Sequence, residues 1–405
     1  MVAAIAIAAI CQTGAWGQTI GEVGTRSVDG VATAVYVINV DEADHPRGNP
    51  YVLAENQDEV DAILAAGLPL WKEGTGTIAA GEEMANFTGA IYVTDGIYQH
   101  TAAGALGTDG GATFVDGGTL ETKAAGDWGW AANTPASLDA ESISFAGTGY
   151  NGMGALHVGV QSKKLSSGTF TLTGDTLFAA SSGASVSMRG SALNWNFGGY
   201  KLTIKLENSG NGWEIATANS VSGFQELVLE KGILRFGEGF RPEFFQPGVI
   251  RIMGGAMLSL ERTQPIAAAV ELEDGARLRV ANNGNVIATD YEAGGSTTRD
   301  VISGPVTLKG AVTNAVAAGK VLTISGKVSG SGSFVGGIGG WIRLTGVANT
   351  FAGGVSVEGT LSDGVVSGGL ELGSGTPISL EGGGTHRKRP TSATNRRCRT
   401  AVAFV

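Results

Sequence analysis

The side chains of this sequence that could do chemistry are mainly carboxylates on short predicted strands. Because side chains alternate between the two faces of a strand, Glu271 and Glu273 point the same way, and so do Glu226 and Glu230. Cleavage of a glycosidic bond uses two carboxylates about 5 to 9.5 Å apart. The alternative is that these acids face solvent, which we favour for the whole set: Asp175, Glu226, Glu230, Glu271, Glu273 and Asp274.

Histidine and serine could supply metal-binding or nucleophilic groups. His45, His100 and His157 lie apart from any HxH, HExxH or cysteine-rich pattern of a metal site. A nucleophilic serine on an α/β fold would lie in a Gly-x-Ser-x-Gly turn before a helix, and the sequence has no such turn. We therefore expect these histidines to be loop or half-buried strand residues. We predict no enzymatic activity and no catalytic, cofactor-binding or metal-binding residue.

Three other features have both a functional and a structural interpretation. Residues 41–45, Asp-Glu-Ala-Asp-His, fit a calcium or other cation site or a solvated loop, and we favour the loop. Residues 147–154 are glycine-rich like a phosphate-binding loop, but without a Lys-Ser/Thr pair and a following helix they predict a turn. Five tryptophans could form a row for sugar stacking or could equally belong to the core or an end cap: Trp128, Trp130, Trp195, Trp213 and Trp341.

The composition limits the kind of protein that carries these residues. Of 405 residues, 66 are glycine and 10 are proline, and glycine does not recur at every third position, which excludes collagen. Disorder is excluded because 42% of the residues are hydrophobic and only 16% are charged. The formal charge of −10 argues against binding to nucleic acid. The cysteines, Cys11 and Cys398, are too few for a disulfide scaffold.

From about residue 70 onward the sequence predicts a series of short strands. Apolar and polar residues alternate over four to seven positions and are then interrupted by Gly, Asn, Asp or Ser, as in residues 201–205 and 321–325. Almost no helical period lies between these strands, so βαβ crossovers are not expected. We predict an all-β parallel β-solenoid with glycine at its corners. A set of antiparallel sandwiches is the alternative.

An internal repeat supports this prediction. Residues 87–93 and 351–357 both read F-x-G-x-[I/V]-x-V, and both are followed by a carboxylate and a glycine. An Ala-Asn pair precedes each copy, at residues 85–86 and 348–349. Over residues 70–122 and 326–384 this order of strands and turns resembles the autotransporter-associated β-strand repeat of bacterial surface proteins.

The resemblance implies a right-handed parallel β-helix that is exported as a passenger, either displayed on the outer membrane or secreted. We expect a structural or adhesive protein that acts as a monomeric rod, with surface glycans or cell-surface proteins as partners. Such passengers are often followed by a translocator β-barrel, and we expect none in this chain because its end lacks the alternating strands of about 10 residues that a barrel requires. The alternatives are a β-helix polysaccharide lyase or hydrolase and a carbohydrate-binding module.

The two ends of the sequence differ from the repeats. Residues 1–17 predict a signal peptide cleaved after Gly17, and the rest of the chain predicts no transmembrane segment. Residues 18–70 predict an N-terminal cap with a short helix at 58–64, and residues 71–384 predict the solenoid. Residues 385–405 hold six basic residues and no acid. A genuine basic tail, a processing or sorting signal and a frameshifted or disordered end all fit this last segment.

Overall fold

The computed structural model describes most of the chain between residues 20 and 372. The described residues are 20–108, 111–123, 142–159, 163–215, 220–237, 245–261, 265–280, 301–317, 320–336, 340–346, 349–353, 355–356, 360–362, 365–367, 369–372 and 387–388. The predicted signal peptide lies outside them, and so does the basic tail except for β35 (Arg387–Lys388).

The chain forms a parallel β-solenoid of about nine turns, which confirms the predicted fold class. The handedness implied by the family resemblance stays a prediction. By their internal contacts the residues make two compact units, 1–181 and 182–405. No helix among the described residues has the length and apolar composition needed to cross a lipid bilayer.

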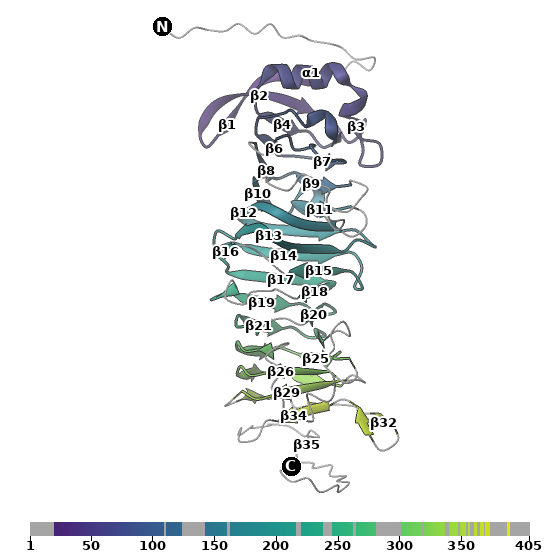
Figure 1. The fold of residues 1–405 in the computed structure, drawn as a ribbon, viewed down its shortest axis with the longest axis vertical. Coiled ribbons are helices and arrows are strands. Elements are labelled where there is room, and N and C mark those ends of the chain that lie inside the picture. Colours follow the sequence, from purple (N-terminus) through teal and green to yellow (C-terminus); the bar gives the residue numbers. More distant parts are fainter. Residues whose placement is uncertain are drawn as a thin grey trace. The chain divides into compact units, whose positions relative to one another are not determined.

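In the first unit, two columns of strands are stacked coil upon coil (Figure 1). One column pairs β4 (Leu70–Glu73), β6 (Ile91–Val93), β8 (Ala112–Asp116) and β10 (Ser142–Gly147) in parallel. The other pairs β5 (Thr77–Ala80), β7 (Ile97–His100), β9 (Thr119–Thr122) and β11 (Leu156–Val158). The long β12 (Lys163–Ala180) pairs with β10 near its start and with β11 at its end.

The second unit repeats this architecture. Its first column contains β14 (Lys201–Leu206), β17 (Glu226–Lys231), β19 (Val249–Ile252), β21 (Ala269–Leu272), β24 (Val306–Leu308), β27 (Val328–Gly330) and β30 (Thr350–Phe351). Its second contains β13 (Val186–Asn196), β15 (Gly212–Ile215), β18 (Ile233–Phe236), β20 (Met257–Leu260), β22 (Arg277–Val280), β25 (Ala311–Asn314), β28 (Ser333–Val335) and β31 (Val355–Ser356). A further sheet contains β23 (Val301–Ile302), β26 (Val321–Ile324), β29 (Trp341–Leu344), β34 (Gly369–Leu372) and β35. The shorter β16 (Ser220–Ser222) pairs with β13, and β32 (Thr360–Ser362) pairs with β33 (Val365–Ser367).

The core is built from the apolar residues that alternate along each strand. In the second unit, register neighbours on five successive coils are fully buried: Leu227, Ile250, Val270, Val306 and Val328. Burying each such side chain contributes about 1.5 to 3 kcal/mol relative to leaving it in water. The strand period seen in the sequence therefore becomes a continuous apolar stack along the coils.

Glycine at the corners has a specific steric cause, as Gly96 shows. Its φ of +61° lies in the left-handed region. A Cβ there would lie 2.4 Å from the carbonyl oxygens of both Gly74 and Gly76, on the preceding coil. The corner is thus open only to glycine.

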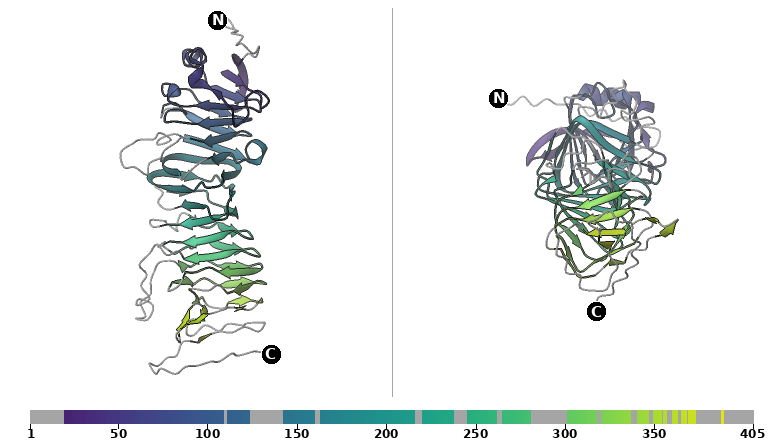
Figure 2. Two further views of the ribbon diagram at one scale, coloured as in Figure 1. Left: turned by 90° about the vertical axis from the view of Figure 1, so that its right-hand side faces the viewer. Right: turned by 60° about the horizontal axis from the view of Figure 1, so that its bottom comes forward.

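The N-terminal cap of the first unit is a hairpin followed by a helix (purple in Figures 1 and 2). β1 (Gly21–Val28) pairs antiparallel with β2 (Val31–Asn39), and β2 pairs with β4 of the first coil. After β3 (Tyr51–Val52) and the short η1 (Leu53–Glu55), α1 (Gln57–Ala66) buries Val60 and Ile63 and is capped at its C-terminus by Gly67. The helix predicted at 58–64 is confirmed, with one residue more at its start and two more at its end.

Candidate functional site

A buried polar column crosses three coils of the first unit. Gln99 on β7, Glu121 on β9 and His157 on β11 are register neighbours. They are only 1%, 0% and 3% exposed. Polar side chains are rarely buried to this extent without hydrogen-bond partners. The groups that contact Gln99, Glu121 and His157 therefore indicate the role of this column.

The connection between β2 and β3, residues 40–50, covers this column. The Arg47 side chain donates from Nε to Glu121 Oε1 at 2.9 Å, and its Nη2 also contacts that oxygen. The Arg47 carbonyl accepts hydrogen bonds from Gln99 Nε2 (3.2 Å) and Lys123 Nζ (3.3 Å). Arg47 therefore ties the loop to two strands through both its side chain and its backbone.

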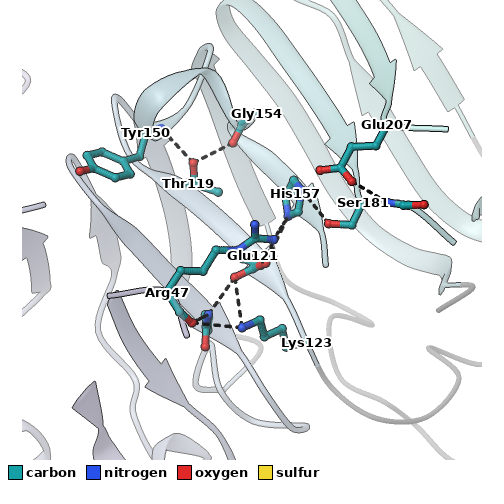
Figure 3. Close-up of polar contacts among 11 residues, drawn as sticks. Arg47, Thr119, Glu121, Lys123, Tyr150, Gly154, His157, Ser181 and Glu207 are labelled. Carbon is teal, nitrogen blue, oxygen red and sulfur yellow. Dashed lines mark hydrogen bonds and ion pairs between the residues drawn. The ribbon is translucent and has the colours of Figure 1, made fainter. Parts of the chain in front are cut away.

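Glu121 is the centre of the cluster (Figure 3). Besides Arg47, its carboxylate lies 2.8 Å from Gln99 Nε2, 3.3 Å from His157 Nδ1 and 4.0 Å from Lys123 Nζ. Burial alone would raise the pKa of Glu121. Hydrogen bonds from His157 and Arg47, together with the charges of Arg47 and Lys123, outweigh burial and lower that pKa to about 2. The carboxylate is therefore ionised at any physiological pH.

His157 connects this carboxylate to a serine. Its Nδ1 lies 3.3 Å from Glu121 Oε1 and 3.2 Å from Arg47 Nη2, and its Nε2 lies 3.3 Å from Ser181 Oγ. Ser181 directly follows β12 and is partly exposed, whereas His157 is buried. Serine, histidine and glutamate thus follow one another across the coils, as Figure 3 shows.

The same loop is held at a second point by the turn between β10 and β11. Tyr150 Oη donates to the Glu42 carboxylate at 2.7 Å. Thr119 Oγ1 donates to the Gly154 carbonyl and accepts from the Tyr150 N–H, both at 2.9 Å. Residues 147–154 are therefore a corner, as predicted, with the short η3 (Tyr150–Gly152) and five residues at positive φ.

The cation site considered for residues 41–45 gains no support from the structure. Within the part of the chain that is described, no three side chains of His, Cys, Asp or Glu are grouped so as to hold a metal ion. His45 packs edge-on against Tyr51 with ring centroids 5.3 Å apart. Its carbonyl accepts from the Thr77 N–H at 2.8 Å, so the segment is a docked loop.

Three of the six candidate acids converge in the second unit. Arg251 on β19 lies 3.2 Å from Glu226, 3.1 Å from Glu271 and 4.0 Å from Glu273. Lys309 lies 2.6 Å from Glu271 and 3.1 Å from Glu273. The remaining acids are elsewhere: Glu230 pairs with Lys205 at 3.4 Å, Asp274 accepts from the Ala311 N–H at 2.7 Å, and Asp175 is exposed.

Of the five tryptophans considered for sugar stacking, the two whose side chains the structure describes are core residues. Trp195 and Trp213 are 4% and 0% exposed and belong to the core, while Trp128, Trp130 and the side chain of Trp341 lie outside the described part. A different set of rings is stacked on the first unit: Trp71, Tyr92 and Phe114 are half-buried register neighbours with centroids 4.8 Å apart. Their faces cover one another, and this stack joins consecutive coils.

Sequence reasoning missed most of the buried cluster. It considered His157 as an isolated residue and did not single out Arg47, Gln99, Glu121 or Ser181. One signal was available: Gln99 and Glu121 both occupy the third position of a four-residue strand, 22 residues apart.

Comparison with known proteins adds no assignment. No family model matches the chain, and neither a curated protein nor a solved structure is significantly similar to it.

Proposed function

We propose that this protein is an exported β-solenoid of the passenger type, displayed on a bacterial surface or secreted, with a structural or adhesive role. The observation that supports it most is the solenoid itself, in which one strand architecture recurs from β4 to β31. Such a fold offers long lateral faces without needing a cofactor to stay folded. Surface glycans or other cell-surface proteins are the partners that this role implies.

The repeat that carries the family resemblance has a structural counterpart in each unit. Phe87, which precedes β6, and Phe351, on β30, are 2% and 0% exposed. Phe351 packs edge-on against Phe334 of the preceding coil at 5.7 Å. The aromatic residue of the motif therefore fills the core, and the motif supports a repeated architectural unit.

A carbohydrate-active protein is the second candidate, on the strength of one observation. Glu226, Glu271 and Glu273 converge on Arg251, the combination of acids and a basic residue expected on the binding face of a polysaccharide lyase or hydrolase. The ion pairs with Arg251 and Lys309 also satisfy these charges without a substrate. Turnover of a polysaccharide decides between the two candidates.

Export and binding are tested on the full chain expressed in a Gram-negative host. We expect mature protein that begins at residue 18, accessible to protease on intact cells or present in the medium. An uncleaved protein confined to the cytoplasm would refute the export proposal. On glycan arrays the mature protein should bind without releasing reducing sugars or unsaturated products, and any such release would favour the enzyme.

A further inference from the structure

The Ser181, His157 and Glu121 side chains form a hydrogen-bonded relay whose geometry suits nucleophilic catalysis. Ser181 Oγ lies 3.3 Å from His157 Nε2, and Nδ1 of the same ring lies 3.3 Å from Glu121 Oε1. A nucleophile, a base and a group that orients the base must lie in this order, and their distances are commonly longer without substrate than with it.

The contacts of His157 Nδ1 accommodate the tautomer that the relay requires, although Arg47 Nη2 also lies 3.2 Å from this nitrogen. Arg47 Nη2 can only donate, and both it and His157 Nδ1 lie beside the same oxygen, Glu121 Oε1. Both donors are satisfied when Nδ1 carries the proton and shares that oxygen with Arg47. This assignment leaves the lone pair of Nε2 directed at the Ser181 hydroxyl.

Burial and exposure are distributed as such a relay requires. Glu121 and His157 are 0% and 3% exposed, so their interaction is little screened by water. Ser181 is partly exposed, and the next two residues, Ser182 and Gly183, are exposed. The proposed nucleophile thus lies on a residue that solvent reaches, while the base stays in its buried setting.

We propose that Ser181 is a nucleophile for carboxylic esters, with His157 as its general base and Glu121 as the residue that positions His157. The Ser181 oxygen bonds to the ester carbonyl carbon while its proton moves to His157 Nε2. The bond from that carbon to the alcohol oxygen then breaks, and Nε2 returns the proton to the departing alcohol. Water releases the acyl group from Ser181 by the same proton transfers, so that ester and water give acid and alcohol.

In a purely structural role, Ser181 would only provide a hydrogen-bond partner for the buried Nε2 of His157. Arg47, Gln99, Lys123 and Glu121 already fasten the 40–50 loop to the strands without the serine hydroxyl. The loop-fastening function therefore predicts no special reactivity at residue 181. Reactivity that depends on His157 separates the two roles.

The test uses the full mature chain with a fluorophosphonate probe and with p-nitrophenyl acetate. We expect the probe to modify Ser181, identified by peptide mass spectrometry, and S181A to abolish that labelling. S182A is the matched control, since it removes a neighbouring, more exposed hydroxyl, and it should label as the wild type does. Loss of the base in H157Q should lower the labelling rate and ester hydrolysis about 10²- to 10⁴-fold.

Positioning by Glu121 has its own readout. E121D should retain more hydrolysis than E121Q, and E121Q should alter the pH–rate profile, with folding of each variant checked by circular dichroism. If E121Q does not fold, S181A and H157Q still decide. Wild-type hydrolysis in S181A, or equal labelling of Ser181 and Ser182, would overturn the proposal and would leave the surface role untouched.

Discussion

Polar side chains gather on consecutive coils in both units, but in opposite surroundings. In the first unit Glu121 is fully buried beneath Arg47. In the second unit Arg251 and Glu271 are also register neighbours, yet their side chains stay 35% and 25% exposed. Both groups join register neighbours on stacked coils, and among the described residues the loop of residues 40–50 covers the first group. Burial beneath that loop should turn a weak surface contact into a strong one.

Removing the arginine from each group should give the largest contrast. Arg47→Ala leaves the buried Glu121 carboxylate without its main partner, which should destabilise β9 by about 3 kcal/mol. Arg251→Ala leaves acids that water can reach, so less than about 1 kcal/mol is expected around β21. Native-state hydrogen exchange measures the two strands separately. Equal protection losses in the two strands would contradict the role given to burial.

The amino-acid sequence predicts the fold and the second group of this contrast, but not the first group. The strand period and the corner glycines, such as Gly96, predict the solenoid because both are local properties of the chain. Glu271 and Glu273 could also be placed together, since side chains two residues apart on a predicted strand point to the same face. Arg47 and Glu121 meet across 74 residues through the docking of a loop, and no local period encodes that contact.

Acid should affect the first group more than the second. The folded pKa of Glu121 is about 2, against an ordinary value of 4.5, because the effect of burial is outweighed by hydrogen bonds from His157 and Arg47 and by the charges of Arg47 and Lys123. The ionised carboxylate therefore adds its full contribution to the free energy of unfolding above about pH 4.5. That contribution, about 3 kcal/mol in all, is lost as the pH falls towards 2. The difference in stability between wild type and Glu121→Gln, measured by urea unfolding from pH 6 to 2, should shrink over that window. A constant difference would show that the carboxylate is not held in this way.

Alkaline pH should act on a second buried charge of the first unit. Lys72 is 0% exposed, and burial lowers its pKa to about 7 despite the nearby charges of Asp95, Glu73 and Asp41. The unfolded chain then binds more protons above pH 7, so stability should rise between about pH 7 and 10. Three carbonyls, of Glu73, Gly74 and Asp95, accept from its ammonium group and oppose this shift, so we expect only about 1 to 2 kcal/mol. Lys72→Met should remove the rise, and a rise that persists in this variant would assign it to other groups.

Lys309 in the second unit should have the smallest effect on stability. Its charge should make the protein less stable as the pH rises, the opposite of the effect of Lys72. Hydrogen bonds to Glu271 and Glu273 raise the pKa of Lys309. Its contribution to the free energy of unfolding is therefore complete below the ordinary lysine pKa and is lost only as the pH rises past the raised value. Because its side chain is 36% exposed, water and salt screen the pair, and Lys309→Met should cost less than about 1 kcal/mol. Raising the salt concentration from 0.05 to 1 M should abolish the destabilisation caused by Lys309→Met and leave most of the destabilisation caused by Arg47→Ala. If salt reduced both destabilisations equally, the 40–50 loop would not exclude water from Glu121.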